Sequence, residues 1–405
     1  MQLKSKKGVD IYHEYYINMD LKKMPLPKVC KIPVGDVRQI LRWNKTVGDK
    51  VKKYDILAYL KGEIPIYSPF SGNFNQIETS PKIGSIAGLK YAVIYTEEDF
   101  SPSYPLYNGE EELTKASFYE TIRKNAVFDD ERRDYLFNTL KGLESFSCVV
   151  IDGFDDQPYN LSKTATILNY YNEVYEGAGF LLKVFGGKDI KLLINKNCQT
   201  DKFLNRYDEG ITKITVGGKY PTLPVIDNFC EKENGIKIGA QTCRAIYRAV
   251  YFGEADLSRI ITVWGDSIAE PSVVEVPFGV LAESLLKEFY AFGLIERVVG
   301  GGVMTGHTAS LNFPVYKWES SLTVMPLKKH HNTTECIGCG RCALVCPMGL
   351  APYYILRNSK FKGTLKAKEL CVEQCILCGA CGYICPSRLP LVDKIAKIKE
   401  REQNV

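Results

Sequence analysis

Two groups of four cysteines near the C-terminal end carry the clearest chemical signal in this sequence. They read Cys336-x-x-Cys339-x-x-Cys342-x-x-x-Cys346-Pro347 and Cys375-x-x-Cys378-x-x-Cys381-x-x-x-Cys385-Pro386. At this spacing, three thiolates in one tight turn can reach three iron corners of a cubane, while the fourth cysteine points away. In proteins with two such clusters, the fourth cysteine of each group ligates the other cluster.

The spacing therefore predicts two [4Fe–4S] clusters with interleaved ligands. We assign Cys336, Cys339, Cys342 and Cys385 to one cluster, and Cys375, Cys378, Cys381 and Cys346 to the second. Glycines inside both groups leave room for the cube and let backbone N–H groups turn toward its sulfurs. Structural zinc is the alternative, but zinc is usually held by two separated Cys-x-x-Cys pairs.

The other cysteines show no ligand spacing. Cys371 lies four residues before Cys375 and is interpreted as a buried residue, with a spare thiol or a substitute ligand as the alternatives. Five more are expected to be small core residues, namely Cys30, Cys148, Cys198, Cys230 and Cys243. A disulfide framework is disfavoured because nine of the fourteen cysteines lie between Cys336 and Cys385, in a long chain without a secretory signal.

Composition excludes several classes of function. The net charge of +5 is spread over 52 basic and 47 acidic side chains, so we expect no nucleic-acid partner. No run of about 18 apolar residues is present, and no apolar signal-peptide core follows Met1. We therefore expect a cytoplasmic protein without direct membrane insertion, peripheral to any membrane complex through its partners.

The elements that must position the clusters are those of a multidomain α/β protein. Residues 1–100 contain short apolar runs separated by turn residues and resemble a β hammerhead (biotinyl/lipoyl-like) domain without an attachment lysine. Residues 101–228 show a βα rhythm typical of a Rossmann-like domain, and residues 229–325 form another α/β module. Residues 326–405 hold the helical dicluster ferredoxin domain.

Individual elements follow from hydrophobic periodicity. The pattern predicts helices over 118–124, 132–141, 161–185, 241–252 and 281–291. It predicts strands over 148–151, 190–195, 259–264, 273–276 and 297–302. A short Gly177-Ala-Gly-Phe falls inside the long helix and is interpreted as close helix packing rather than as a phosphate cradle.

Several motifs, taken in chain order, resemble the RnfC family. This family comprises the cluster-bearing subunit of ion-pumping ferredoxin:NAD oxidoreductases and soluble relatives such as the proline reductase-associated electron transfer protein. The motifs are Val47-Gly-Asp-Lys-Val-Lys-Lys, Ser68-Pro-Phe-Ser-Gly, Glu173-Val-Tyr-Glu-Gly, Thr242-Cys-Arg-Ala-Ile-Tyr-Arg, Gly300-Gly-Gly-Val-Met-Thr-Gly and Cys385-Pro-Ser-Arg-Leu-Pro-Leu-Val. The resemblance implies that the 229–325 module is an SLBB β-grasp domain and that the Rossmann-like domain derives from one that holds FMN and meets NADH.

Three loops depart from the family pattern around that flavin site. A glycine-rich phosphate loop is replaced by Asn125-Ala-Val-Phe-Asp-Asp-Glu-Arg-Arg-Asp-Tyr, whose Asp129, Asp130 and Glu131 would repel a phosphate. A second loop survives only as Asp152-Gly-Phe-Asp-Asp-Gln-Pro-Tyr, and a third has become Tyr220-Pro-Thr-Leu. The flavin/NADH site is therefore interpreted as degenerate, and we expect no bound FMN.

The leading hypothesis is an iron–sulfur subunit that relays single electrons to or from a partner, either other subunits of an oxidoreductase complex or a soluble redox protein. The alternative is an FMN-dependent NADH dehydrogenase module that feeds its own clusters, with a site rebuilt from Asp155, Asp156 and Tyr159. Three histidines, His307, His330 and His331, are interpreted as solvated residues rather than ligands or proton carriers.

Overall fold

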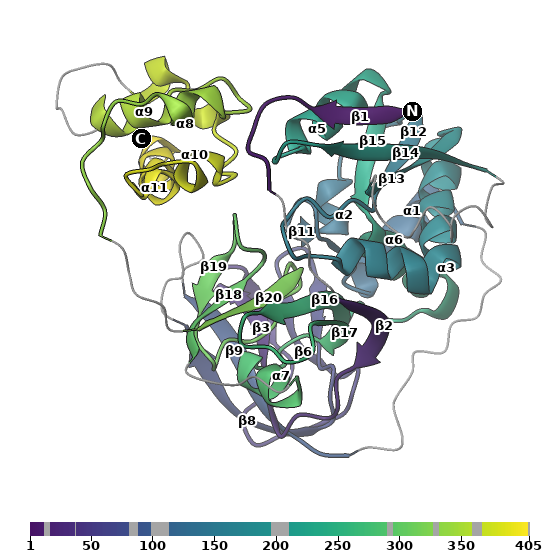
Figure 1. The fold of residues 1–405 in the computed structure, drawn as a ribbon. Coiled ribbons are helices and arrows are strands. Elements are labelled where there is room, and N and C mark those ends of the chain that lie inside the picture. The colour runs from purple at the N-terminus through teal and green to yellow at the C-terminus, as the bar shows by residue number, and fades with distance from the viewer. Residues whose placement is uncertain are drawn as a thin grey trace.

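A five-stranded parallel sheet forms the centre of the upper right part of the molecule in Figure 1. The computed structural model describes residues 1–11, 17–36, 38–80, 88–98, 113–195, 210–289, 295–326, 332–358 and 367–403. In spatial order, the strands are β1 (Gln2–Ser5), β14 (Ile211–Gly218), β13 (Asp189–Asn195), β12 (Cys148–Asp152) and β15 (Gly235–Gly239). Every described pairing between them is parallel.

Helices cover both faces of this sheet because successive residues of its strand β12 (Cys148–Asp152) are buried and point to opposite faces. The helices are α1 (Lys115–Lys124), α2 (Leu136–Thr139), α3 (Ser162–Phe185), α5 (Leu223–Lys232) and α6 (Ala240–Phe252). Val149 and Ile151 of β12 pack with α1, α3 and α6, whereas Cys148 and Val150 pack with α5 on the opposite face. The predicted βα rhythm is confirmed, with β12, α3, β13 and α6 within a residue or two of the predicted bounds.

Helices α3 and α6 touch through a glycine. A Cβ atom at Gly177 would lie 1.9 Å from the carbonyl oxygen of Cys243, whereas a Cβ atom at Gly179 would meet nothing within 4 Å. The interpretation of Gly177 as a close-packing residue is confirmed. The described members of the five-cysteine group, Cys30, Cys148, Cys230 and Cys243, are all buried as expected, and Cys198 lies outside the described residues.

A second body, in the lower part of Figure 1, contains three more sheets. The six-stranded sheet has the order β19 (His307–Ala309), β18 (Ile295–Gly300), β20 (Ser321–Pro326), β16 (Ser258–Gly265), β17 (Ser272–Pro277) and β2 (Asn18–Lys23). The smaller sheets are β3 (Val29–Asp36), β9 (Leu89–Thr96), β8 (Gly72–Thr79) and β5 (Lys50–Val51), and β4 (Ile40–Trp43), β6 (Ile56–Leu60) and β7 (Ile64–Tyr67). One continuous core joins them, together with the short helix α7 (Ala282–Glu288).

The sheets divide the chain differently from the segments expected at 1–100, 101–228 and 229–325. Strand β1 joins the parallel sheet, β2 joins the six-stranded sheet, and β15 with α6 belongs to the parallel sheet rather than to the module that follows. The reason is that strand partners lie far apart in sequence, so that Gln2 pairs with Thr215 and Cys148 with Gly235. Local periodicity carries no information about such pairings.

The predicted helix over 132–141 is also corrected. This stretch forms β11 (Asp134–Tyr135) and the four-residue α2, and β11 pairs with β10 (Phe128–Asp129). The Asp129 carboxylate accepts hydrogen bonds from the backbone N–H groups of Glu131 and Arg132. These bonds hold a turn where the helix was expected to begin, because aspartate side chains compete with helical hydrogen bonding.

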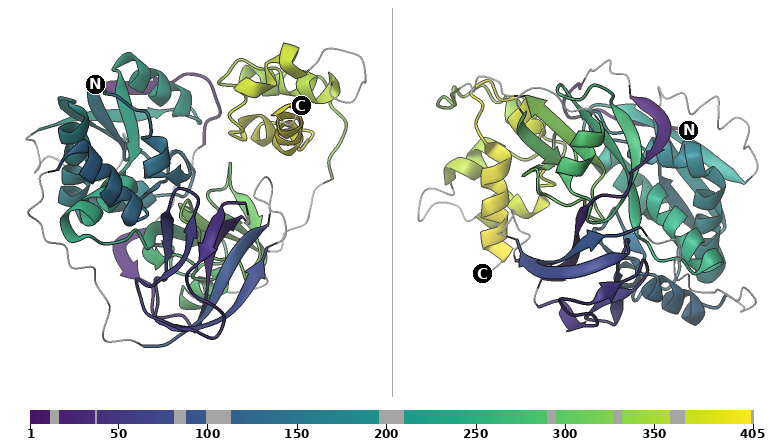
Figure 2. Two further views of the ribbon diagram at one scale, coloured as in Figure 1. Left: turned by 180° about the vertical axis from the view of Figure 1, so that it is seen from behind. Right: turned by 90° about the horizontal axis from the view of Figure 1, so that it is seen from below.

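The cysteine-rich part lies beside both bodies, at the upper left of Figure 1 and at the upper right of the left-hand view of Figure 2. It consists of α8 (Arg341–Leu344), α9 (Pro352–Asn358), two short 3₁₀ turns (Ala367–Leu370 and Val372–Gln374), α10 (Ala380–Tyr383) and α11 (Leu391–Gln403). A small core that includes Leu350, Ile355, Val372 and Ile395 holds these helices together. Among the described residues, no helix is both long and apolar enough to cross a bilayer.

Candidate metal centre

Both cysteine groups are built in the same way. The chain passes through two cysteines without regular structure and then enters a four-residue helix, α8 or α10, that carries the third. The residue before each helix is a glycine in the left-handed region, Gly340 with φ 70° and Gly379 with φ 85°. Only glycine adopts this conformation without steric cost, so the glycines allow the sharp turn that gathers the cysteines.

Three cysteines of the second group meet the fourth cysteine of the first group. Cys375, Cys378, Cys381 and Cys346 line one small cavity, whose other walls are the apolar residues Pro347, Met348, Leu350, Pro352, Ile355, Ile376, Leu377, Val392 and Ile395, with Gly379 and Ala380. This is the set that the spacing assigns to the second cluster. Within the described part of the chain, no three His, Cys, Asp or Glu side chains converge closely enough to hold a single metal ion, and the four sulfurs surround a cavity instead.

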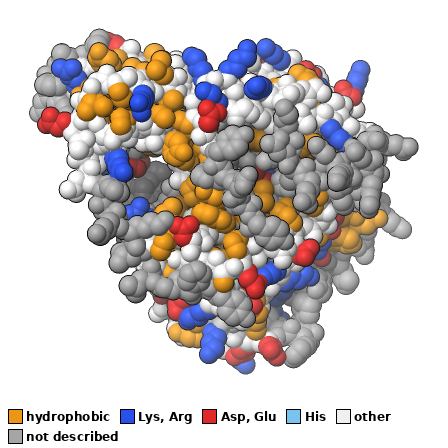
Figure 3. Space-filling model, in the orientation of Figure 1, with side chains coloured by type: hydrophobic (Ala, Val, Ile, Leu, Met, Phe, Trp, Pro, Cys, Tyr) orange, Lys and Arg blue, Asp and Glu red, His pale blue; other side chains and the backbone are white. Residues whose placement is uncertain are grey.

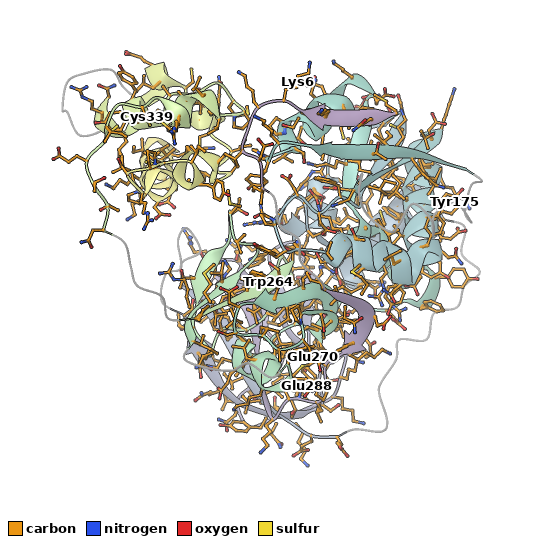
Figure 4. The ribbon with its side chains drawn as sticks, in the orientation of Figure 1. Lys6, Tyr175, Trp264, Glu270, Glu288 and Cys339 are labelled. Carbon is orange, nitrogen blue, oxygen red and sulfur yellow. The ribbon has the colours of Figure 1, made fainter. Side chains whose placement is uncertain are left out.

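The other set is more open to solvent, because it includes the exposed Cys339, whereas the second set includes the buried Cys346. Cys342 and Cys385 are near enough that an ionised Cys385 raises the pKa of Cys342, although burial is the larger cause of that rise. Cys336 is half-buried and Cys339 is exposed. In Figure 4, Cys339 lies on the side of this part that faces away from the sheets.

The chemistry of the donors fits iron–sulfur clusters. All eight donors are sulfur, and backbone N–H groups already point at two of them, from Gly338 to Cys336 Sγ at 3.4 Å and from Leu350 to Cys346 Sγ at 3.3 Å. Such N–H···S bonds are a usual way for a protein to support a cluster. Burial raises the pKa of Cys378 to about 11 and that of Cys381 to about 12. Metal binding must therefore displace their protons.

Cys371 lies beside these residues without joining them. It packs against the small core formed by Leu350, Val372 and Ile395, and it is half-buried. The residues that line the four-cysteine cavity do not include it.

Comparisons with known proteins agree with the arrangement of the cysteines. Residues 328–386 match the family described as a 4Fe-4S dicluster domain. Over 357 residues, the chain is 27% identical to the RnfC protein of the ion-translocating oxidoreductase complex of Vibrio cholerae, in a match that covers 80% of this chain and 46% of the relative. The chain is a homologue of RnfC.

Other RnfC relatives extend the match. The RnfC protein of the same complex from Pectobacterium carotovorum is 27% identical over 391 residues, which cover 86% of this chain and 50% of the relative. The corresponding protein of the proton-translocating ferredoxin:NAD(+) oxidoreductase complex of Clostridium ljungdahlii is 25% identical over 390 residues, covering 86% of this chain and 83% of the relative. The chain thus spans about half the length of the first two relatives.

In this RnfC homologue, the second cysteine group contacts the rest of the chain. The Tyr220 hydroxyl donates a hydrogen bond of 2.7 Å to the carbonyl oxygen of Cys378, and Gln157 Nε2 donates to that hydroxyl at 3.0 Å. A Cβ atom at Gly379 would lie 2.6 Å from the carbonyl oxygen of Met304. Tyr220 and Met304 belong to motifs noted in the sequence, but nothing in the sequence indicated that they meet a cysteine.

At the starts of α3 and α6, carboxylates of the chain itself occupy the positions next to the helix N-termini. Asp155 accepts hydrogen bonds from the backbone N–H groups of Lys163 at 3.0 Å and Thr164 at 2.9 Å, at the start of α3. Asp130 accepts a bond from the Thr242 hydroxyl at the start of α6, and a Cβ atom at Gly239 would lie 2.2 Å from Asp130 Oδ1. Helix N-termini attract anions, and here the anions are side chains.

A half-buried lysine neutralises part of the charge of these acidic residues. Lys163 Nζ lies 2.5 Å from Glu131 and 2.7 Å from Asp152. Burial raises the pKa of Asp152 to about 7 and that of Asp130 to about 6. Burial also acts to raise the pKa of Glu131, but Lys163 and Lys237 outweigh it and lower that pKa to about 2. These acidic side chains therefore point into the protein, where Glu131 and Asp152 form ion pairs with Lys163 and Asp130 accepts a hydrogen bond from Thr242.

The residues proposed for a rebuilt flavin site are engaged by the chain itself. Asp156 accepts hydrogen bonds from the backbone N–H and the hydroxyl of Thr222, at 3.1 and 2.9 Å. The Tyr159 ring stacks on Trp264 with centroids 3.6 Å apart and planes at 7°. Trp264 is labelled in Figure 4, in the six-stranded sheet.

The interpretation of His307 as a solvated residue is wrong. Its side chain is 29% exposed, its ring packs against Phe313 at 4.9 Å, and its Nε2 lies 3.7 Å from Glu319 Oε1. His307 lies in β19, and its side chain points inward. The glycine that precedes it could not indicate this orientation. His330 and His331 lie outside the described residues.

Proposed function

We propose that this chain is an iron–sulfur electron-transfer subunit that relays single electrons through two [4Fe–4S] clusters, to or from a partner oxidoreductase. Cys336, Cys339, Cys342 and Cys385 would hold one cluster, and Cys375, Cys378, Cys381 and Cys346 the other. The bound clusters supply one-electron redox chemistry. The observation that carries the proposal is the cavity lined by cysteines from both groups, because interleaved ligands keep two clusters adjacent.

We further propose that the α/β part acts as a scaffold without FMN, and that its sheets correspond to hammerhead, Rossmann-like and SLBB β-grasp units. The carboxylates of Asp155 and Asp130 at the starts of α3 and α6 support this, since a phosphate placed there would meet like charge. The partner would be another subunit of an oxidoreductase complex or a soluble redox protein. The chain would work in the cytoplasm and reach a membrane only through that partner.

Anaerobic purification with iron and inorganic sulfide counting tests the ligand sets. The wild-type chain is expected to carry two cubanes, and Cys346→Ala and Cys385→Ala are each expected to lose about half of the iron and sulfide. Cys371→Ala is the matched control, a cysteine of the same region, and is expected to retain both cubanes. Loading of the wild-type chain with zinc alone, or full iron content in Cys346→Ala, would refute the proposal.

The second candidate is an FMN-dependent NADH dehydrogenase module, which the persistence of the five-stranded parallel sheet favours. The flavin content of the purified protein and the bleaching of cluster absorbance by NADH decide between the two. Bound FMN together with NADH-dependent bleaching establishes the module. A protein without flavin whose clusters are reduced by dithionite but not by NADH establishes the relay.

A further inference from the structure

The two cysteine groups are internal repeats of each other. Cys336-Ile-Gly-Cys-Gly-Arg-Cys-Ala-Leu-Val-Cys aligns without gaps on Cys375-Ile-Leu-Cys-Gly-Ala-Cys-Gly-Tyr-Ile-Cys. Both turns pass through a left-handed glycine into a helix of four residues. Each position on one loop therefore has a structural counterpart on the other, and their surroundings can be compared directly.

The second loop is covered by the chain itself. Gly379 lies against the Met304 carbonyl, and the neighbouring Ala380 is buried with Val9 and Tyr220. The Cys378 carbonyl accepts the hydrogen bond from Tyr220. In the second loop, this face therefore packs against other parts of the same chain.

The same face of the first loop is open. A Cβ atom at Gly340, the counterpart of Gly379, would meet nothing within 4 Å, and Arg341, the counterpart of Ala380, is exposed. Beside the exposed Cys339, Ile337 is 70% exposed and Leu344 is 77% exposed; the counterpart of Leu344, Tyr383, is also exposed, so the contrast between the loops lies at Gly340 and Arg341. In Figure 3, the cysteine-rich part at the upper left shows hydrophobic side chains interspersed with Lys and Arg.

We propose that Ile337, Cys339, Gly340, Arg341 and Leu344, the first-loop face, form the docking surface for an electron-carrier protein. The inference rests on the proposed function. Two large apolar side chains next to an exposed cluster ligand call for an apolar partner surface. Arg341 calls for a carboxylate on that partner, while Glu335, the other charged residue of this loop, precedes the first cysteine.

The transfer at this face exchanges one electron and no atoms. The centre of the partner would lose one electron and the cluster held by Cys336, Cys339, Cys342 and Cys385 would gain it, or the reverse. The covered loop then faces the body of the protein and the open loop faces the partner, so the two clusters have distinct inner and outer roles.

The test uses the iron-loaded full chain and a reduced, acidic bacterial ferredoxin as the probe. Arg341→Glu and Leu344→Ser are expected to weaken ferredoxin binding about tenfold and to slow cluster reduction by ferredoxin by a similar factor at low concentration. Tyr383→Ser is the matched control, because Tyr383 is the counterpart of Leu344 and is 54% exposed. It is expected to bind as the wild-type chain does.

Reduced methyl viologen, which needs no docking surface, separates this inference from the proposed function. Wild-type chain that holds no cubanes, or that methyl viologen does not reduce, contradicts the proposed function itself. Two results would overturn only the docking surface, provided that methyl viologen reduces the chain normally. One is that the wild-type chain does not bind ferredoxin, and the other is that both variants bind it as the wild type does. Sedimentation that shows a wild-type dimer and monomeric variants also overturns it, since a second copy of the chain would then cover the face.

Discussion

Replacement of Gly177 by alanine tests whether α3 and α6 depend on a missing side chain. The added methyl group would lie 1.9 Å from the Cys243 carbonyl oxygen and 2.7 Å from its carbonyl carbon, both backbone atoms of α6. Because the atoms in the way are backbone atoms, no flexible side chain can move aside to make room. The two helices must separate by more than about 1 Å to restore an ordinary contact.

The expected magnitude combines two opposing effects. Alanine in place of glycine within a helix stabilises it by about 1 kcal/mol. Overpacking of a close contact costs about 1–3 kcal/mol and more when backbone must move. Since both α3 and α6 would shift, the upper part of that range applies, and we expect Gly177→Ala to lower the free energy of unfolding by about 2 kcal/mol.

Gly179→Ala is the matched control in the same helix. Its Cβ atom meets nothing within 4 Å, so only the propensity effect remains and stability is expected to rise by about 0.5–1 kcal/mol. Urea unfolding followed by circular dichroism measures both variants against the wild-type chain. The two substitutions must change the free energy of unfolding in opposite directions.

Equal stability of the two variants would refute the packing argument. Insoluble Gly177→Ala beside soluble Gly179→Ala would agree with it. Flavin content measured in the same samples addresses the rival interpretation of Gly177-Ala-Gly-Phe as a phosphate cradle, because loss of bound flavin in Gly179→Ala without loss of stability would favour the cradle.

Three further single substitutions and one double variant probe buried charge. Burial raises the pKa of Glu319 to about 8, and neither of its carboxylate oxygens has a hydrogen-bond partner among the described residues. Because the folded-state pKa lies above the unfolded value, its contribution to stability is greatest below about pH 4.3 and is lost as the pH rises toward 8, by up to about 1.4 kcal/mol per pH unit. The melting temperature of Glu319→Gln should therefore fall less between pH 5 and pH 8 than that of the wild-type chain, and parallel curves would contradict this. Arg259→Met leaves Asp256 buried without its 2.8 Å ion pair and should cost about 3–5 kcal/mol in urea unfolding. The double variant with Asp256→Asn should recover part of that loss, and additive losses would argue against coupling. Asp155→Ala removes the carboxylate that accepts the Lys163 and Thr164 N–H groups in the first turn of α3 and should cost about 1 kcal/mol in the same assay, whereas an unchanged value would mean that water replaces the carboxylate.

The local parts of the fold were predictable because they depend on neighbours in the sequence. The periodicity of residues 161–185 is sufficient for α3, and the β-branched run at Cys148 is sufficient for β12. Gly177 could be interpreted as a packing residue because glycine inside a strongly helical pattern needs a special reason. The assignment of cysteines to two interleaved sets also followed from spacing alone, and it stays a proposal until iron is counted.

The inward fold of the acidic loop was not predictable in its details. The sequence indicated that Asp129, Asp130 and Glu131 would oppose a phosphate. It could not indicate that Lys163 and Thr242, which lie on α3 and α6, would hold two of these carboxylates. These contacts join residues that are distant along the chain, and only the packed helices bring them together.

The sequence alone determined which residues could ligate metal, where the main helices and strands begin, and which glycine had to stay small. Tertiary structure alone decided that β1 and β2 enter different sheets, that β15 completes the parallel sheet, and that one cysteine loop is covered while its repeat is open. The physical reason is the range of the interactions. Ligand spacing and helical periodicity act over a few residues, whereas strand pairing and domain contacts depend on surfaces that exist only once distant segments have folded.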